Sequence, residues 1–83
     1  MNFSKNLMSL EDQVKRTLDD FENTPSEKIL EILNQIKSKF KSQLISEYLQ
    51  GKIQKILEIN NEAEKKKQCK ALTPYLDWYL QGL

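Results

Sequence analysis

Few of the residues that usually carry out catalysis or bind metals occur in this 83-residue sequence. It contains no histidine, which is the commonest general base and the commonest transition-metal ligand. The only glycines are Gly51 and Gly82, so no glycine-rich loop is present to hold a phosphate. The acidic group Asp19, Asp20 and Glu22 lacks the spacing of a calcium-binding loop. The sequence therefore predicts a protein that is not an enzyme and has no metal, cofactor or small-molecule substrate.

The single cysteine, Cys69, is the one candidate nucleophile. A cysteine reacts as its thiolate, which neighbouring lysines such as Lys66 and Lys70 could favour. A half-buried thiol that contributes to packing is the simpler interpretation. One cysteine cannot form an internal disulfide, so a reducing compartment is expected.

The densest basic cluster consists of Lys65, Lys66, Lys67 and Lys70. On a helix, Lys66 and Lys70 lie on one face. Such a face could contact the phosphates of a nucleic acid or the headgroups of an anionic membrane. The net charge is only +1, however, and no nucleic-acid recognition motif accompanies the lysines. A solvated helix face is therefore the favoured interpretation of this cluster.

The C-terminal segment, residues 73–83, carries three of the seven aromatic residues of the chain. On a helix, Tyr75 and Tyr79 share one apolar face, whereas Trp78 points in another direction. Aromatic side chains with a polar tip are enriched at the energetic centres of protein interfaces, and lysines can steer a partner towards them. The alternative is that this segment closes the hydrophobic core. The predicted partner-binding residues are Tyr75, Trp78, Tyr79, Lys66 and Lys70.

The elements that must position these residues are helices. In the first part of the chain, apolar residues recur at helical spacing. They are Phe3, Leu7, Leu10, Val14, Leu18 and Phe21. Ser9 can cap the first turn, which predicts a helix over residues 9–22. The short connection that follows predicts that the first two helices form an antiparallel hairpin.

A second helix is expected to begin at Thr24-Pro25-Ser26-Glu27. Thr24 can cap it, Pro25 suits the first helical position, and Glu27 can reach back to the cap. Its expected buried stripe consists of Ile29, Leu33, Ile36, Phe40 and Leu44.

Two interpretations remain for the end of this second helix. Gly51 could end it as a left-handed cap, with a new helix beginning at Lys52. Alternatively, the chain breaks near Lys41-Ser42, and a third helix continues through Gly51 to Ile59. The polar stretch at residues 37–43 and the unbroken apolar phase across Gly51 favour the second interpretation.

The last third of the chain contains two further helix starts. Asn61, with Glu64 three residues later, predicts a new capped helix. Thr73-Pro74 either begins a short aromatic helix or marks a kink in a longer one. The predicted fold is therefore an all-α bundle of three or four helices with a short aromatic C-terminal helix, in one domain over residues 1–83. A core this small is marginal, so a partner or a second copy of the chain would help to cover it.

The charges are unevenly distributed along the sequence. Residues 1–36 contain 4 basic and 7 acidic side chains, a balance of −3, and residues 37–70 contain 9 basic and 4 acidic ones, a balance of +5. Opposite charges of this kind could pair within the bundle or between two copies, or offer a basic face to a partner. No secretory signal or membrane-spanning run is apparent, and a cytoplasmic location is expected.

These patterns predict a small intracellular protein-binding module, acting as a regulator, adaptor or inhibitor through its helix faces and aromatic C-terminal segment, with a homodimer as a further expectation. One alternative is a helical protein that binds nucleic acid through its lysine faces. Another is a bundle of the bacteriocin-immunity type, acting at the inner face of a membrane. Proteins of that type are similar to this chain in small size and lysine-rich helices, without a shared motif.

Overall fold

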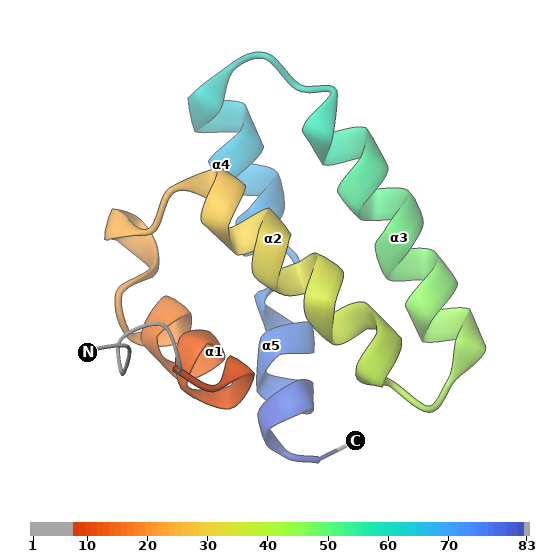
Figure 1. Ribbon diagram of the computed structural model, residues 1–83. Coiled ribbons are helices and arrows are strands. Elements are labelled where there is room, and N and C mark those ends of the chain that lie inside the picture. The colour runs from red at the N-terminus through yellow and green to blue at the C-terminus, as the bar shows by residue number, and fades with distance from the viewer. Residues whose placement is uncertain (1–7, 83) are drawn as a thin grey trace, which may run out of the picture.

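The computed structural model describes residues 8–82, which form an all-α fold (Figure 1). Its helices are α1 (Leu10–Asp19), α2 (Ser26–Ile36), α3 (Gln43–Leu57), α4 (Glu62–Lys70) and α5 (Thr73–Leu80), with short 3₁₀ turns at Phe21–Asn23 and Lys37–Lys39. The prediction of an all-α protein with a short aromatic C-terminal helix is confirmed. The described part has five α-helices rather than three or four, because the chain turns at Ala71-Leu72 between α4 and α5.

Three of the helices begin where a polar side chain caps the first turn. The Ser9 side chain accepts a hydrogen bond from the backbone N–H of Asp12 at 3.0 Å. Asn61 accepts one from the N–H of Glu64 at 2.8 Å, as the sequence predicts. Ser42 does the same at the start of α3, where its hydroxyl accepts from a backbone N–H in the first turn. These caps satisfy N–H groups that have no partner within the helix.

The start of α2 differs from the expected capping box. Pro25 is extended, with φ −61° and ψ 146°, and occupies the cap position, so the helix begins at Ser26. Thr24, which precedes a proline, is also extended, with φ −93° and ψ 123°. Its hydroxyl donates to the carbonyl oxygen of Asp20 at 2.8 Å and does not cap the helix. The prediction that Thr24 caps α2 is therefore wrong, because the proline moves the helix start one residue further along.

Helix α1 is shorter than the predicted segment of residues 9–22. It ends at Asp19, and Asp20 leaves the helical conformation with φ −134° and ψ 47°. Acidic side chains near a helix C-terminus are unfavourable for the macrodipole. Phe21 belongs to the following 3₁₀ turn and packs against the core. Phe3 and Leu7, the first members of the predicted stripe, lie outside the described residues.

The break near Lys41-Ser42 is confirmed, and α3 passes through Gly51 without interruption. Ile29, Leu33, Ile36 and Phe40 are buried, as the stripe predicts. Leu44 is not, because the chain starts a new helix at Gln43 and the phase of the stripe is lost. The side chain of Leu44 is 80% exposed, so its assignment to the core is wrong.

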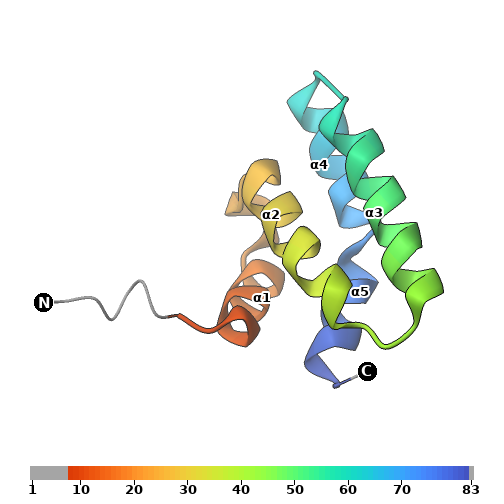
Figure 2. The same cartoon turned by 45° about the vertical axis from the view of Figure 1, so that its right-hand side comes forward.

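Helix α2 is the centre of the fold and contacts all four other helices. It crosses the middle of the molecule and runs in the opposite direction to α1, in agreement with the predicted hairpin (Figure 1). Its buried apolar residues are Ile29, Leu30, Ile32, Leu33 and Ile36. By contrast, α3 lies at the edge of the molecule in both views (Figures 1 and 2). It packs against α2 and α4 on one side only.

Candidate protein-binding surface

Large apolar side chains of α3 and α5 meet on the outside of the molecule. Leu44 and Tyr48 lie one turn apart on α3, and Tyr75 and Trp78 lie one turn apart on α5. Leu44 is 80% exposed, Tyr48 50% and Trp78 38%, and Tyr75 is half-buried between them. We call these four residues the aromatic surface.

The Tyr75 ring is the centre of the aromatic surface. Its centroid lies 5.1 Å from that of Trp78 in an edge-to-face arrangement and 6.0 Å from that of Tyr48. Beneath it, the buried Phe40 ring is 6.3 Å away, again edge to face. Spacings of this size are favourable for aromatic pairs. The rings are therefore held by one another and by the core, which makes the surface rigid.

Charged residues of both signs accompany the aromatic surface: Lys52 follows Tyr48 on α3, and the exposed Glu47 and Asp77 directly precede Tyr48 and Trp78 in the chain. Lys52 lies one turn after Tyr48, and its Nζ is 5.9 Å from the Tyr48 ring centroid, at the outer limit for a cation–π contact. Burial, and to a lesser extent the neighbouring Tyr48, raise the pKa of Tyr75. The raised pKa favours the neutral phenol of Tyr75, whose hydroxyl can donate or accept a hydrogen bond.

Two of the five predicted site residues, Tyr75 and Trp78, come together in this surface. Tyr79, like Tyr75, is half-buried and packs against the hydrophobic core, but its ring is not part of the aromatic contacts that join Tyr48, Tyr75 and Trp78. The two interpretations of the C-terminal segment thus apply to different faces of α5. One face closes the core through Leu76, which is fully buried, and another is exposed through Trp78.

The two predicted lysines have different environments on α4. The Nζ of Lys66 donates to the carbonyl oxygen of Glu22 at 3.1 Å and lies 5.2 Å from the Phe21 ring centroid. These contacts join α4 to the turn that follows α1, so Lys66 has a structural role. Lys70 is exposed in the last turn of α4, where a positive charge is favourable for the helix dipole.

Cys69 is fully buried in the core rather than half-buried. Burial, followed by the charge of Glu62, raises the pKa of its thiol to about 11, although Lys65 and Lys66 act in the opposite direction. At neutral pH the group is a protonated thiol without access to solvent, which does not act as a nucleophile. Its contribution is packing, in line with the simpler interpretation of the sequence.

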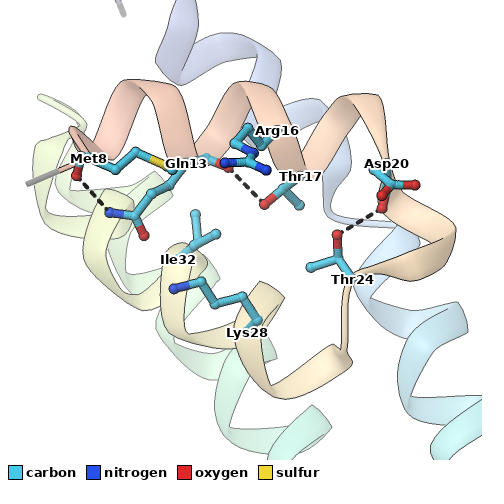
Figure 3. Close-up of a pocket in the computed structure, with 8 residues that line it drawn as sticks. All are labelled: Met8, Gln13, Arg16, Thr17, Asp20, Thr24, Lys28 and Ile32. Carbon is cyan, nitrogen blue, oxygen red and sulfur yellow. Dashed lines mark hydrogen bonds between the residues drawn. The ribbon is translucent and has the colours of Figure 1, made fainter. Parts of the chain in front are cut away.

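An open pocket of about 470 Å³ lies between α1 and α2 (Figure 3). It is lined by Met8, Gln13, Arg16, Thr17, Asp20, Thr24, Lys28 and Ile32. Its polar groups are largely engaged with the chain itself: the hydroxyl of Thr17 donates to the Gln13 carbonyl at 2.9 Å, and Lys28 pairs with Glu31 at 3.7 Å. The pocket combines both signs of charge and brings no nucleophile beside a base, so it lacks the parts of a catalytic site.

Neither a metal site nor a membrane span is found in the described structure. Within residues 8–82, no group of three or more histidine, cysteine, aspartate or glutamate side chains is placed to hold a metal ion. None of the helices described is both long and apolar enough to cross a membrane.

Leu44 and Tyr48 are the members of the aromatic surface that sequence reasoning missed. Both fit the apolar pattern of a helix, and the pattern does not reveal which side of α3 faces the core. Ser42 was the available signal, because a cap at this position restarts the helix and rotates Leu44 away from the preceding stripe.

Similarity to known proteins assigns no role to this surface. No protein-family model matches the chain, and neither a curated protein nor a solved structure matches it at a significant level.

Proposed function

We propose that this protein is a small, non-enzymatic module of the cytoplasm that binds another protein through the aromatic surface. It would act as a regulator, adaptor or inhibitor, since binding is the activity for which its residues are suited. The observation that carries the proposal is that the exposed rings of Tyr48 and Trp78 both lie against Tyr75, with Leu44 one turn from Tyr48; the exposures of Leu44, Tyr48 and Trp78 are 80%, 50% and 38%. Single exposed apolar residues are ordinary, but a contiguous group from two helices is typical of an interaction site.

The aromatic surface is suited to binding for two physical reasons. Tyr48, Tyr75 and Trp78 have few rotatable bonds and pack against one another, so little conformational entropy is lost when a partner covers them. Each also combines a large apolar area with a polar group that can form a hydrogen bond at the interface. Such residues are frequent among those that contribute most to binding energy.

Quantitative affinity capture from an extract of the native cells tests this proposal. Leu44→Ser removes the most exposed apolar side chain, and we expect it to reduce the captured partner strongly without loss of fold. Leu57→Ser is the matched control, because Leu57 is also on α3 and 52% exposed, but it lines a groove towards α2. Trp78→Ala should behave like Leu44→Ser. Equal capture by the parent chain, Leu44→Ser and Trp78→Ala would contradict the proposal.

The other expected functions stay predictions. Binding to nucleic acid through lysine faces would give an affinity that falls linearly with the logarithm of salt concentration. Of the lysines predicted to carry it, Lys66 is engaged with Glu22 and Phe21. Action at the inner face of a membrane, as in bacteriocin-immunity bundles, would require binding to anionic vesicles. Homodimer formation can be measured by sedimentation at several protein concentrations.

A further inference from the structure

The charges around the aromatic surface identify the chemistry of a partner. Residues 37–57 contain five lysines and one acidic residue, Glu47. Lys39, Lys41 and Lys55 are exposed, and in the described part of the chain none of the five lysines forms an ion pair. From these observations, and resting on the proposed function, we infer that the occupant of the aromatic surface is an acidic amphipathic helix of another protein.

The outer side of α3 has a shape that accepts a helix. Leu44, Tyr48, Gly51 and Lys55 follow one another at spacings of four, three and four residues, which places them in one row along the helix. The buried Leu49, Ile53 and Ile56 face the opposite way. A side-chain carbon at Gly51 would have no neighbour within 4 Å, so the backbone is open to close approach there. The row is about 16 Å long, which corresponds to about three turns of a partner helix.

The contacts with such a helix divide into two kinds. Its apolar stripe would pack on Leu44, Tyr48 and Trp78, which supply the affinity. Aspartates or glutamates beside that stripe would lie close to Lys52 and Lys55, which project from the same side of α3. These lysines would orient the partner and accelerate its association.

A second copy of this chain fits the surface less well than a foreign helix. A two-fold pairing of aromatic surfaces would bring the lysines of both copies together, which is repulsive. The acidic helix of the chain, α1, cannot serve as the ligand either. Its exposed residues Glu11, Asp12 and Asp19 are accompanied by Lys15 and Arg16, and its apolar side is occupied by the core, with Val14 fully buried.

Selection from a displayed library of helical peptides against the full chain tests this inference. The peptides have about four turns, randomised side chains on one face and no tryptophan. We expect enrichment of sequences with net negative charge and apolar residues at helical spacing. Trp78 is the only tryptophan of the chain, so its emission reports binding of each selected peptide directly. Enrichment of neutral or basic peptides, or no enrichment, would overturn the inference.

Charge reversal provides the matched comparison. The double variant Lys52→Glu/Lys55→Glu should lose about tenfold or more in affinity for the selected peptides. The control Lys15→Glu/Lys67→Glu, which makes the same change in net charge at exposed positions of α1 and α4, should lose less than about twofold. Lys52 is half-buried, so the single variant Lys55→Glu, at an exposed position, preserves the test if the double variant does not fold. Equal losses in the two double variants would overturn the inference.

Two further measurements separate other occupants. The chain is titrated with vesicles of phosphatidylserine and phosphatidylcholine while the Trp78 emission is followed. If the vesicles bind more tightly than the peptides, the occupant of the aromatic surface is a membrane and not a helix. If sedimentation of the parent chain depends on concentration and Leu44→Ser abolishes this dependence, the occupant is a second copy of the chain. If Leu44→Ser loses the native partner but Lys52→Glu/Lys55→Glu retains it fully, the inference fails while the proposed function stands. If Leu44→Ser retains the partner, the proposed function itself fails.

Discussion

Helices α2 and α3 have nearly the same share of apolar residues, but the fold uses them differently. Five of the eleven residues of α2 are apolar, and all five are buried. Seven of the fifteen residues of α3 are apolar, yet only Leu49, Ile53 and Ile56 are buried. The difference arises because α2 contacts all four other helices, whereas α3 contacts helices on one side only.

This comparison indicates that apolar content beyond what the core requires is available for a partner. Of the exposed apolar residues of α3, Tyr48 lies beside Tyr75 and Leu44 lies one turn from Tyr48, whereas Leu57 lies apart from them, towards α2. A small chain has little apolar surface to spare for its own stability. The exposure of leucine and aromatic side chains at this place is the reason why we propose that they bind a partner.

The largest expected effect comes from making the same substitution on the two helices. Leu33→Ala in α2 removes a side chain that is fully buried, and should lower the free energy of unfolding by about 2–5 kcal/mol. Leu44→Ala in α3, at an 80% exposed position, should change it by less than about 0.5 kcal/mol. Urea denaturation followed by circular dichroism measures both. Similar losses in the free energy of unfolding of the two variants would contradict the exposed position of Leu44 on α3.

The next effect concerns the pH dependence of the core that α2 shares with α4. The pKa of Cys69 rises from 9.0 to about 11 in the folded protein. Below pH 9 both states keep the proton, so this group adds no pH dependence. Between pH 9 and 11 only the unfolded chain loses the proton, which should lower stability by up to about 2–3 kcal/mol. Stability measured in urea from pH 8 to 11 should therefore fall more steeply in the parent chain than in Cys69→Ala. Parallel curves for the two chains would contradict a buried thiol.

A smaller effect is expected at the first residue of α2. The Ser26 hydroxyl is buried and lies 2.8 and 2.9 Å from the two carboxylate oxygens of Glu62 in α4, to which it donates a hydrogen bond. Ser26→Ala should lower the free energy of unfolding by about 1 kcal/mol, because the exposed Glu62 can regain water. Ser38→Ala is the control, since Ser38 is exposed and bonds only to a nearby carbonyl. If the melting temperature shifts equally in both variants, the result would argue against a specific link between α2 and α4.

An effect of similar size but opposite sign is expected on the exposed side of α3. Gly51→Ala meets no atom within 4 Å and should raise the free energy of unfolding by about 1 kcal/mol, because alanine favours the helix. Gly82→Ala should not, since Gly82 has φ 85°, which is unfavourable for a residue with a side chain. The melting temperatures of Gly51→Ala and Gly82→Ala, each compared with the parent chain, measure this difference. A loss of stability in Gly51→Ala would mean that the outer row of α3 is less open than described.

Much of the local structure could be predicted from the sequence alone. Ser9 and Asn61 cap their helices as predicted, and the polar residues around Lys41-Ser42 correctly indicated a break. Such signals act over three or four residues and do not depend on the rest of the fold. The prediction failed at Thr24, where the conformational restriction before a proline outweighed the capping preference.

Only part of the candidate site could be predicted from the sequence. Tyr75 and Trp78 could be proposed from their residue types, and the structure brings them together. Leu44 and Tyr48 could not, because they come from a helix that is distant in sequence and whose outer side is defined only by its neighbours. The environment of Lys66 was inaccessible for a related reason: its contacts with Phe21 and Glu22 join segments more than forty residues apart in sequence.

By itself, the sequence determined that this protein is helical and where most of its helices begin, since spacing and capping are local properties of the chain. It also determined that the lysines gather in the middle of the chain. Only the tertiary structure decided that α2 is enclosed while α3 is open on one side, because burial depends on how many other helices surround each one. The aromatic surface exists for that reason: Tyr48 and Tyr75 are far apart in the chain, and only the packing of the helices brings their rings to 6.0 Å from each other, with Tyr75 resting on the buried Phe40.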